Sequence, residues 1–253
     1  MARPRVGVQL IVFGEQLQTD FAGAVKAAAA AGYDGFEMGT PTEERHFEEV
    51  KAARDAAGIV CAGCHAGYRN LSNPDLVSQY VRHTKGLDAE FLITSGDWEW
   101  KTLDDYLQAA ELLNVIGRQC QEAGLTFCFH NHHWEFQPIE GQTPIHLMIA
   151  ATDPSLVKLC PDIYWVAVGG ERPADFISRY RDRIPYYHFK DGLGGEDYRE
   201  FRELGRGNIN LAAALEAALT TPPAWIVAEQ DRSDLPAAES IKISRDYLKS
   251  LYV

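Results

Sequence analysis

The stretch YDGFEMGTPTEERHFEEVKAARDAAGIVCAGCH, residues 33–65, shows the unit from which this chain is built. Its first part, YDGFEMG (33–39), is short and apolar, as expected of a strand. TEERHFEEVKAARDAAG (42–58) has acidic residues in its first turn and Gly58 after its last, which suits a helix. IVCAGCH (59–65) is again typical of a strand. A strand, a helix and a strand in this order predict two parallel strands joined by a helical crossover.

The same alternation continues over the whole chain. We expect strands at 5–11, 33–39, 59–65, 90–96, 125–131, 156–162, 185–190 and 224–229. We expect helices at 19–32, 42–58, 74–89, 103–123, 143–151, 173–182, 209–219 and 236–250. Eight such units predict an α/β fold, a closed (β/α)8 TIM barrel that forms a single domain over residues 1–253.

An open, doubly wound sheet is the alternative architecture for alternating strands and helices. Such a sheet usually carries a glycine-rich phosphate-binding turn after its first strand. The corresponding stretch here, IVFGEQLQTD (11–20), has one glycine. The barrel is therefore the favoured prediction.

Composition narrows the class of protein. The chain of 253 residues is 46% hydrophobic, which is enough for a large core, and it has no run of about 18 apolar residues that could span a membrane. The first residues, MARPRVGVQL, lack the apolar region of a signal peptide, and five cysteines suit reduced thiols in the cytoplasm. A formal charge of −12 repels phosphate backbones, so nucleic acid is not an expected partner.

Residues that can do chemistry gather where the predicted strands end. In TIM barrels the working residues lie at the C-terminal ends of the strands. Those ends carry Glu37, His65, Asp97, Trp98, the run from His130 to Glu135, Asp162, His188, Lys190, Asp191, Glu229 and Asp231. Asp162, His188 and Glu229 each follow an apolar stretch directly. Two carboxylates and an imidazole suit Mn²⁺, Mg²⁺, Co²⁺ or Zn²⁺.

A fourth ligand should come from LTFCFHNHHWEFQP, residues 125–138. The alternation of a strand places His130 and His132 on one side and Asn131 on the other, so the three cannot all bind one ion. Glu135 lies beyond the strand end and could turn back toward it. We predict that His130, whose position the strand fixes, is this ligand and that Glu135 faces the substrate for acid–base work; the alternative is that Glu135 binds the metal.

Three further motifs have simpler explanations beside functional ones. CAGC (61–64) resembles half of a zinc knuckle, but residues three apart on a strand point to opposite faces and no second such pair exists, which favours core packing. The tryptophans Trp98, Trp100, Trp134 and Trp165 lie near strand ends and either fill the core or form a wall for a sugar ring. The glycine-rich loop 192–208, with Arg206 near its end, is either a phosphate cradle or, as we favour, a mobile lid.

Several of these stretches together resemble the xylose-isomerase-like TIM barrels, the sugar phosphate isomerase/epimerase superfamily. They are GYDGFEMG, FHNHHWEF, CPDIYWVAVGG, RIPYYHFKDG, ELGRGNI and WIVAEQD, spread over residues 32–231. The resemblance implies one divalent metal held by a strand-five glutamate, a strand-six aspartate, a strand-seven histidine and a strand-eight glutamate. Asp162, His188 and Glu229 match the last three positions.

Strand five departs from that pattern. The position of the family's first glutamate is here His130, and Glu135 takes the place of the second, so the two-glutamate proton shuttle of the ketose 3-epimerases is in question. The branch with HNH and YWV motifs resembles the inosose dehydratase-like and keto-glycoside-processing members more closely. Endonuclease IV matches poorly, because its additional metal-binding histidine is here Trp165.

The resemblance implies a metal-dependent enzyme, with Mn²⁺ the expected ion, acting on a small keto-sugar or cyclitol through an enediolate. Glu229 is one candidate base, and Glu135 or a histidine is the other. Lys190 and His65 would bind hydroxyls or the developing oxyanion. Contacts with the substrate are expected from Glu37, Trp98, Trp165 and Arg206.

Three functions remain open at this point. An isomerase or epimerase returns the abstracted proton, whereas a lyase or dehydratase expels a neighbouring group after the same first step. A non-catalytic sugar-binding subunit would keep the barrel and lose part of the site, which the altered strand five would permit. Assembly into a homo-oligomer is also left open.

Overall fold

Eight parallel strands surround the centre of the molecule in a computed structural model that describes residues 3–41, 43–195 and 197–251. The strands are β1 (Arg5–Gln9), β2 (Gly35–Gly39), β3 (Val60–Ala66), β4 (Phe91–Ser95), β5 (Thr126–His130), β6 (Val157–Cys160), β7 (Tyr186–Phe189) and β10 (Trp225–Ala228). Their order is β6-β5-β4-β3-β2-β1-β10-β7, with parallel pairing throughout. A parallel bridge between Asp162 and His188 joins the two end strands, which confirms the predicted TIM barrel.

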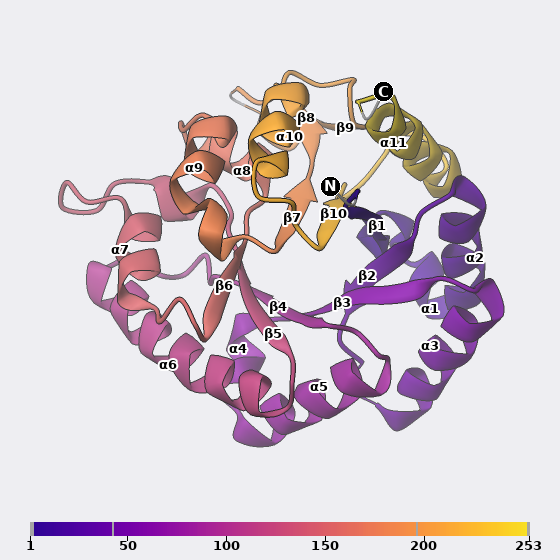
Figure 1. The fold of residues 1–253 in the computed structure, drawn as a ribbon, viewed down its shortest axis with the longest axis horizontal. Coiled ribbons are helices and arrows are strands. Elements are labelled where there is room, and N and C mark those ends of the chain that lie inside the picture. Colours follow the sequence, from indigo (N-terminus) through magenta and orange to yellow (C-terminus); the bar gives the residue numbers. More distant parts are fainter. Residues whose placement is uncertain (1–2, 42, 196, 252–253) are drawn as a thin grey trace.

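Helices surround this ring of strands (Figure 1). They are α1 (Gln16–Thr19), α2 (Phe21–Ala31), α3 (Glu44–Ala57), α4 (Tyr68–Leu71), α5 (Pro74–Gly86), α6 (Leu103–Glu122), α7 (Pro144–Ala151), α8 (Ile163–Val168), α9 (Pro173–Tyr180), α10 (Leu211–Leu219) and α11 (Ala237–Leu251). Short 3-10 turns lie at η1 (Leu10–Phe13), η2 (Trp134–Phe136) and η3 (Arg181–Arg183), and β8 (Asp191–Gly192) pairs with β9 (Phe201–Arg202) as a small antiparallel ribbon.

Each predicted strand and helix has a counterpart in the structure. The Asp20 carboxylate caps α2 by accepting a hydrogen bond from the Gly23 amide at 2.9 Å, and Gly32 ends that helix with a φ of +86°. The first strand is shorter than predicted, because the Gln9 side chain accepts from the Ile11 amide at 2.7 Å and turns the chain into η1. The sequence does not predict helices α1, α4 and α8 or the β8–β9 ribbon.

The interior of the barrel is filled by large side chains opposite glycines. Trp225 and Tyr186, on the neighbouring strands β10 and β7, are both almost fully buried. A Cβ on Gly35 would lie 2.7 Å from the Trp225 ring, so this position needs glycine for Trp225 to cross the barrel. The polar residues at the strand ends therefore lie over a packed floor rather than a channel.

The predicted orientation of the two cysteines in CAGC is wrong. Cys61 Sγ and Cys64 Sγ lie 3.8 Å apart instead of on opposite faces. The pairing between β2 and β3 shifts register between Phe36 and Glu37, so β3 contains a bulge that interrupts the two-residue alternation. Both cysteines belong to the buried core, which agrees with the packing role predicted for them.

Candidate active site

Four ligand-type residues meet at the C-terminal mouth of the barrel. His130 ends β5, Asp162 lies two residues beyond β6, His188 is on β7 and Glu229 directly follows β10. These four strands are consecutive around the barrel, because the Asp162–His188 bridge joins β6 to β7. Each residue offers one ligand atom, and these atoms all lie within 4.8 Å of one another. The four residues predicted to bind metal thus form a single cluster.

The cluster contains buried polar atoms that make no hydrogen bond. Among the described residues His130 Nδ1 has no partner of any kind, whereas Asp162 Oδ2, His188 Nδ1 and Glu229 Oε2 have only charged neighbours. His188 Nδ1 lies against Glu229 Oε2, and Lys190 Nζ is 3.3 Å from Asp162 Oδ2, as ion-pair neighbours. Leaving a buried polar atom unpaired costs roughly 1–3 kcal/mol. Two imidazoles and two carboxylates therefore fit a divalent transition-metal ion such as Mn²⁺.

Local structure aims Asp162 into the cluster. Its Oδ1 accepts from the amides of Tyr164 at 2.9 Å and Trp165 at 3.2 Å, so this oxygen caps α8. The Asn131 side chain, on the neighbouring strand end, pairs with the backbone N–H and C=O of Asp162. Only Oδ2 is left to face the cluster. Burial raises the pKa of Asp162 to about 7, although Lys190 opposes that shift.

Glu37 holds His188 from the other side. Glu37 Oε2 lies 2.6 Å from His188 Nε2, and both side chains are fully buried. His65 Nδ1 and Gln9 Nε2 each lie 3.4 Å from Glu37 Oε1. Burial alone would raise the pKa of Glu37, but its interactions with His188 hold that pKa at about 2. Because Nε2 faces Glu37, Nδ1 is the His188 atom that faces the cluster, and Glu37 is placed to orient this imidazole. A substrate contact for Glu37 remains a prediction.

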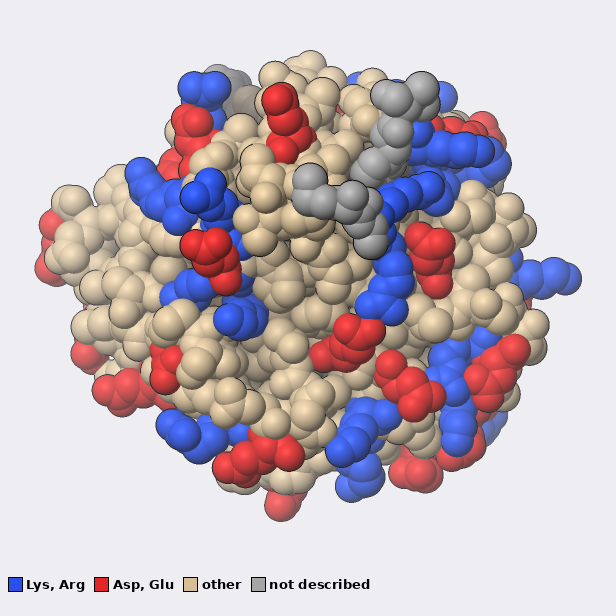
Figure 2. Space-filling view, in the orientation of Figure 1, with Lys and Arg blue, Asp and Glu red and all other residues tan. Residues whose placement is uncertain are grey.

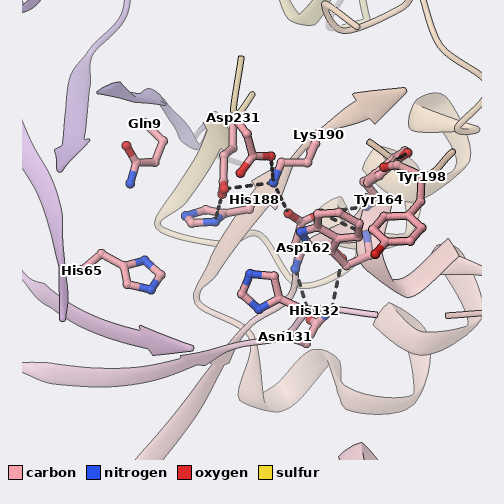
Figure 3. A network of polar contacts seen from close by, with 12 residues as sticks. Gln9, His65, Asn131, His132, Asp162, Tyr164, His188, Lys190, Tyr198 and Asp231 are labelled. Atoms are coloured by element: carbon pink, nitrogen blue, oxygen red, sulfur yellow. Dashed lines mark hydrogen bonds and ion pairs between the residues drawn. The ribbon is translucent and has the colours of Figure 1, made fainter. Parts of the chain in front are cut away.

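Lys190 lies between three carboxylates. Its Nζ is 2.8 Å from Asp231 Oδ2, 3.0 Å from Glu229 Oε1 and 3.3 Å from Asp162 Oδ2. Figure 3 shows Lys190 between Asp231 and Asp162. Burial would lower the pKa of Lys190, but the carboxylates hold it well above its usual value, so the group is an ammonium ion. Asp231 was among the strand-end residues of the sequence but was not assigned a role.

Glu135 lies outside the four-residue cluster. Its Oε2 accepts from the His132 amide at 2.7 Å, and its Oε1 is close enough to Gly96 that a Cβ there would approach it to 2.4 Å. Burial raises the pKa of Glu135 to about 8. His132, two residues beyond β5, lies closer to the cluster: its ring centroid is 4.9 Å from that of His130, and its Nδ1 has no hydrogen-bond partner.

The tryptophans fall into two groups. The Lys190 ammonium lies 5.0 Å from the centre of the Trp165 ring, and Trp134 stacks on His132 at 4.1 Å, so both border the mouth. Trp98 is 61% exposed, and the group over its ring is the Lys101 ammonium at 5.7 Å. Trp100 packs at 4.8 Å against Tyr68. A substrate contact for Trp98 remains a prediction.

Asp191 anchors much of the loop that the sequence suggested as a lid. Its carboxylate accepts from the amides of Gly192, Gly205, Gly207 and Ile209 at 2.9–3.2 Å. Close approach makes glycine necessary at 207, where a Cβ would lie 2.1 Å from Asp191 Oδ1. Arg206 projects from this anchored part, with Nη1 3.4 Å from Glu203 Oε2, and no contact links it to the cluster within the described residues.

The fold is thus a TIM barrel in which two histidines and two carboxylates converge at the C-terminal mouth, over a packed floor. The sequence profile of the Xylose isomerase-like TIM barrel family matches residues 25–251. The chain belongs to that family, which confirms the resemblance drawn from its motifs.

Curated relatives of similar sequence are inosose dehydratases. The chain is 36% identical over 95 residues to that of Geobacillus kaustophilus (strain HTA426), covering 38% of this chain and 28% of the relative. It is 24% identical over 193 residues to that of Lacticaseibacillus casei, covering 69% of this chain and 64% of the relative. The matched segments thus span less than two thirds of these relatives' lengths.

Solved structures share the fold. A sugar phosphate isomerase/epimerase from Parabacteroides distasonis ATCC 8503 superposes with a TM-score of 0.83 at 21% identity, covering 99% of this chain and 95% of that one. A D-psicose 3-epimerase from Clostridium cellulolyticum H10 gives a TM-score of 0.77 at 15% identity, covering 98% and 99% of the two chains.

Two features of the molecule, its helices and its surface charge, bear on contacts with membranes and charged partners. Among the described residues, no helix combines the length and apolar character needed to cross a bilayer. Figure 2 shows basic and acidic side chains interspersed over the face drawn, without a broad area of one sign.

Proposed function

We propose that this chain is an enzyme that binds one divalent metal ion, Mn²⁺ by preference, and removes a proton next to the carbonyl of a keto-sugar or related polyol. The observation that carries the proposal is the cluster of His130, Asp162, His188 and Glu229, whose ligand atoms lie within 4.8 Å of one another. The family, and the sugar and inosose substrates in the names of its relatives, support the substrate class.

The metal, when bound, supplies Lewis-acid polarisation of the substrate carbonyl. The chain supplies the proton transfer. Glu229 is one candidate base, held by the hydrogen bond from Lys190 Nζ to its Oε1 at 3.0 Å. His132 is the other, because its unpartnered Nδ1 can accept a proton in the neutral imidazole. Glu135 fits this role less well, since its carboxyl contacts the turn backbone.

Lys190 is better suited to positioning than to proton transfer in this proposal. Its ammonium lies within 3.3 Å of the carboxylates of Asp162, Glu229 and Asp231 and balances part of their charge. His65 completes the mouth opposite Lys190, beside Gln9 (Figure 3), where it can bind a substrate hydroxyl.

We favour return of the proton, as an isomerase or epimerase, because solved structures of similar fold include sugar epimerases. A lyase or dehydratase of a keto-sugar or inosose is the second candidate, and the names of the inosose dehydratase relatives favour it. Both begin with the same proton abstraction and both belong to small-molecule metabolism.

Proton exchange in D₂O tests the proposal. Purified protein with Mn²⁺ would be incubated with D-fructose, D-tagatose, scyllo-inosose and methyl 3-keto-glucoside, and deuterium at the carbon next to the carbonyl measured by NMR. We expect exchange with at least one compound and its loss in Glu229→Gln. Tight Mn²⁺ and sugar binding without exchange would instead identify a non-catalytic sugar-binding subunit.

A further inference from the structure

Three aromatic side chains lie next to the four-residue cluster, on the side toward the protein surface. His133, from the turn after β5, lies 5.2 Å from Trp165 of α8 and 4.4 Å from Tyr198 of the loop between β8 and β9, as ring centroids. Trp165 and Tyr198 lie 6.0 Å apart. We call these three residues the aromatic shelf. They come from three separate segments, so the tertiary fold assembles the shelf.

The aromatic shelf begins one side chain away from the cluster. Lys190 Nζ is 3.0 Å from Glu229 Oε1 and 5.0 Å from the centre of the Trp165 ring, so Lys190 separates the two. Trp165 is only 5% exposed, whereas His133 and Tyr198 are half-buried. The shelf therefore leads from the buried cluster toward the rim.

Two polar atoms of the aromatic shelf have no partner. Trp165 Nε1 and His133 Nδ1 are buried and make no hydrogen bond, although a buried indole N–H usually finds one. An unpaired buried polar atom carries a desolvation cost that a ligand beside it can offset. Hydroxyl groups of a ligand would satisfy both.

Tyr198 is fixed although it belongs to an irregular loop. The Tyr164 hydroxyl, from a fully buried side chain, donates a hydrogen bond to the Tyr198 carbonyl at 2.8 Å. Figure 3 shows Tyr164 and Tyr198 side by side, with His132 between them and His65. The hydrogen bond from Tyr164 anchors the backbone that carries the Tyr198 ring, so less conformational entropy is lost when a ligand binds there.

We propose that the aromatic shelf is a subsite for a second sugar ring, so that the substrate is a keto-glycoside of two sugars rather than a free monosaccharide. The ring bearing the carbonyl would occupy the cluster, and the second ring would lie beyond Lys190. Its apolar C–H face would stack on Tyr198 and His133, and its hydroxyls would pair with Trp165 Nε1 and His133 Nδ1. This inference rests on the proposed function, because it extends the same site.

Three ligands separate the contributions of the second ring and of its hydroxyls. They are a 3-keto derivative of a glucosyl-glucose disaccharide, cyclohexyl 3-keto-glucoside, which has a ring without hydroxyls, and methyl 3-keto-glucoside. Calorimetry gives the Kd of each, and deuterium exchange at the carbon next to the carbonyl is measured in parallel. We expect the disaccharide to bind about tenfold more tightly than the methyl glycoside, with the cyclohexyl compound between them.

The variants are Tyr198→Ala, Trp165→Phe and, as a control in the same loop, Leu193→Ala, whose side chain is 38% exposed. Tyr198→Ala should remove the tenfold preference and leave the methyl glycoside unaffected. Trp165→Phe should lower the affinity for the disaccharide toward that of the cyclohexyl compound, because the hydroxyls lose one of their two partners. Leu193→Ala should change neither.

Equal affinity of the three ligands for the wild-type protein, or an equal loss for all three in Tyr198→Ala, would overturn the subsite. Exchange with equal affinities would leave the proposed function intact while refuting the aromatic shelf. A tenfold preference for the disaccharide without deuterium exchange would support the aromatic shelf while refuting the proposed proton transfer. If the cyclohexyl compound bound as tightly as the disaccharide, the subsite would be apolar, which would contradict a site for a second sugar ring.

Discussion

The end of β5 and the turn that follows it carry two ligand-type side chains, His130 and Glu135, in different surroundings. His130 is buried among ligand atoms from three other strand ends, and its Nδ1 has no hydrogen-bond partner. Glu135 is equally buried, but its Oε2 accepts from the His132 amide at 2.7 Å, and its Oε1, which also has no hydrogen-bond partner, lies against Gly96 rather than in the cluster. The two side chains are thus similarly buried, but His130 faces the cluster and Glu135 faces the backbone of its own turn.

The difference comes from the backbone. His130 pairs with Ser95 of β4 and Cys160 of β6, so the sheet fixes where its side chain points. Glu135 belongs to η2, where a 3-10 turn rotates successive side chains away from the strand direction. A residue on the strand can therefore be placed from the sequence, whereas one in the turn cannot.

The largest expected effect separates these two residues by metal binding. His130→Ala should reduce Mn²⁺ affinity by more than about 100-fold, because it removes a direct ligand and such losses exceed those from outer partners. Glu135→Gln should keep the wild-type affinity. Calorimetric titration with Mn²⁺ measures both, and the opposite pattern would show that Glu135 is the ligand.

A second effect concerns stability and belongs to Glu135. Burial raises the pKa of Glu135 from 4.5 to about 8 in the folded protein, so the folded state binds the proton more tightly than the unfolded state. Its stabilising contribution is complete below about pH 4.5 and falls as the pH rises toward 8, by on the order of 4 kcal/mol. In Glu135→Gln this part of the pH dependence should disappear.

Urea unfolding between pH 5 and 9 measures this effect, with the metal removed so that only proton binding varies. Glu99→Gln, at an exposed carboxylate, is the matched control and should follow the wild-type curve. If the free energy of unfolding of Glu135→Gln changed with pH as it does in the wild type, Glu135 would not be a buried, protonated carboxyl.

The smallest expected effect on Mn²⁺ affinity comes from Glu37, which contacts the predicted ligand His188. Glu37→Gln weakens the 2.6 Å contact with His188 Nε2, which orients His188 and increases the basicity of its other nitrogen. Mn²⁺ affinity should fall by about 10- to 100-fold, less than in His130→Ala. An unchanged Kd would mean that Glu37 does not act through His188, and Glu99→Gln again serves as the control.

The fold and the cluster could be predicted because both depend on strand geometry. Alternating strands and helices specify the barrel, and consecutive strand ends place His130, Asp162, His188 and Glu229 together. The sequence favours His130 over Glu135 as the ligand but keeps Glu135 as the alternative, because the alternation of a strand stops applying where the strand ends.

Strand geometry does not predict the contacts between side chains or the paths of loops. Asp231 contacts Lys190 at 2.8 Å across a loop whose path the sequence does not specify, and the contact of Glu37 with His188 at 2.6 Å joins strands far apart in the sequence. The bulge in β3 brought Cys61 and Cys64 to one side, since a single extra residue reverses the alternation. Arg206 and Trp98 lie in loops and were placed at the mouth only by their position in the chain.

The central claim is that one divalent ion binds at the four-residue cluster, and the metal content of Asp162→Ala tests it most directly. After loading with Mn²⁺ and desalting, elemental analysis should give one ion per wild-type chain and none for Asp162→Ala. Asp97→Ala, at another strand-end carboxylate that instead pairs with Arg69, should retain its ion. Full occupancy in Asp162→Ala would contradict the account.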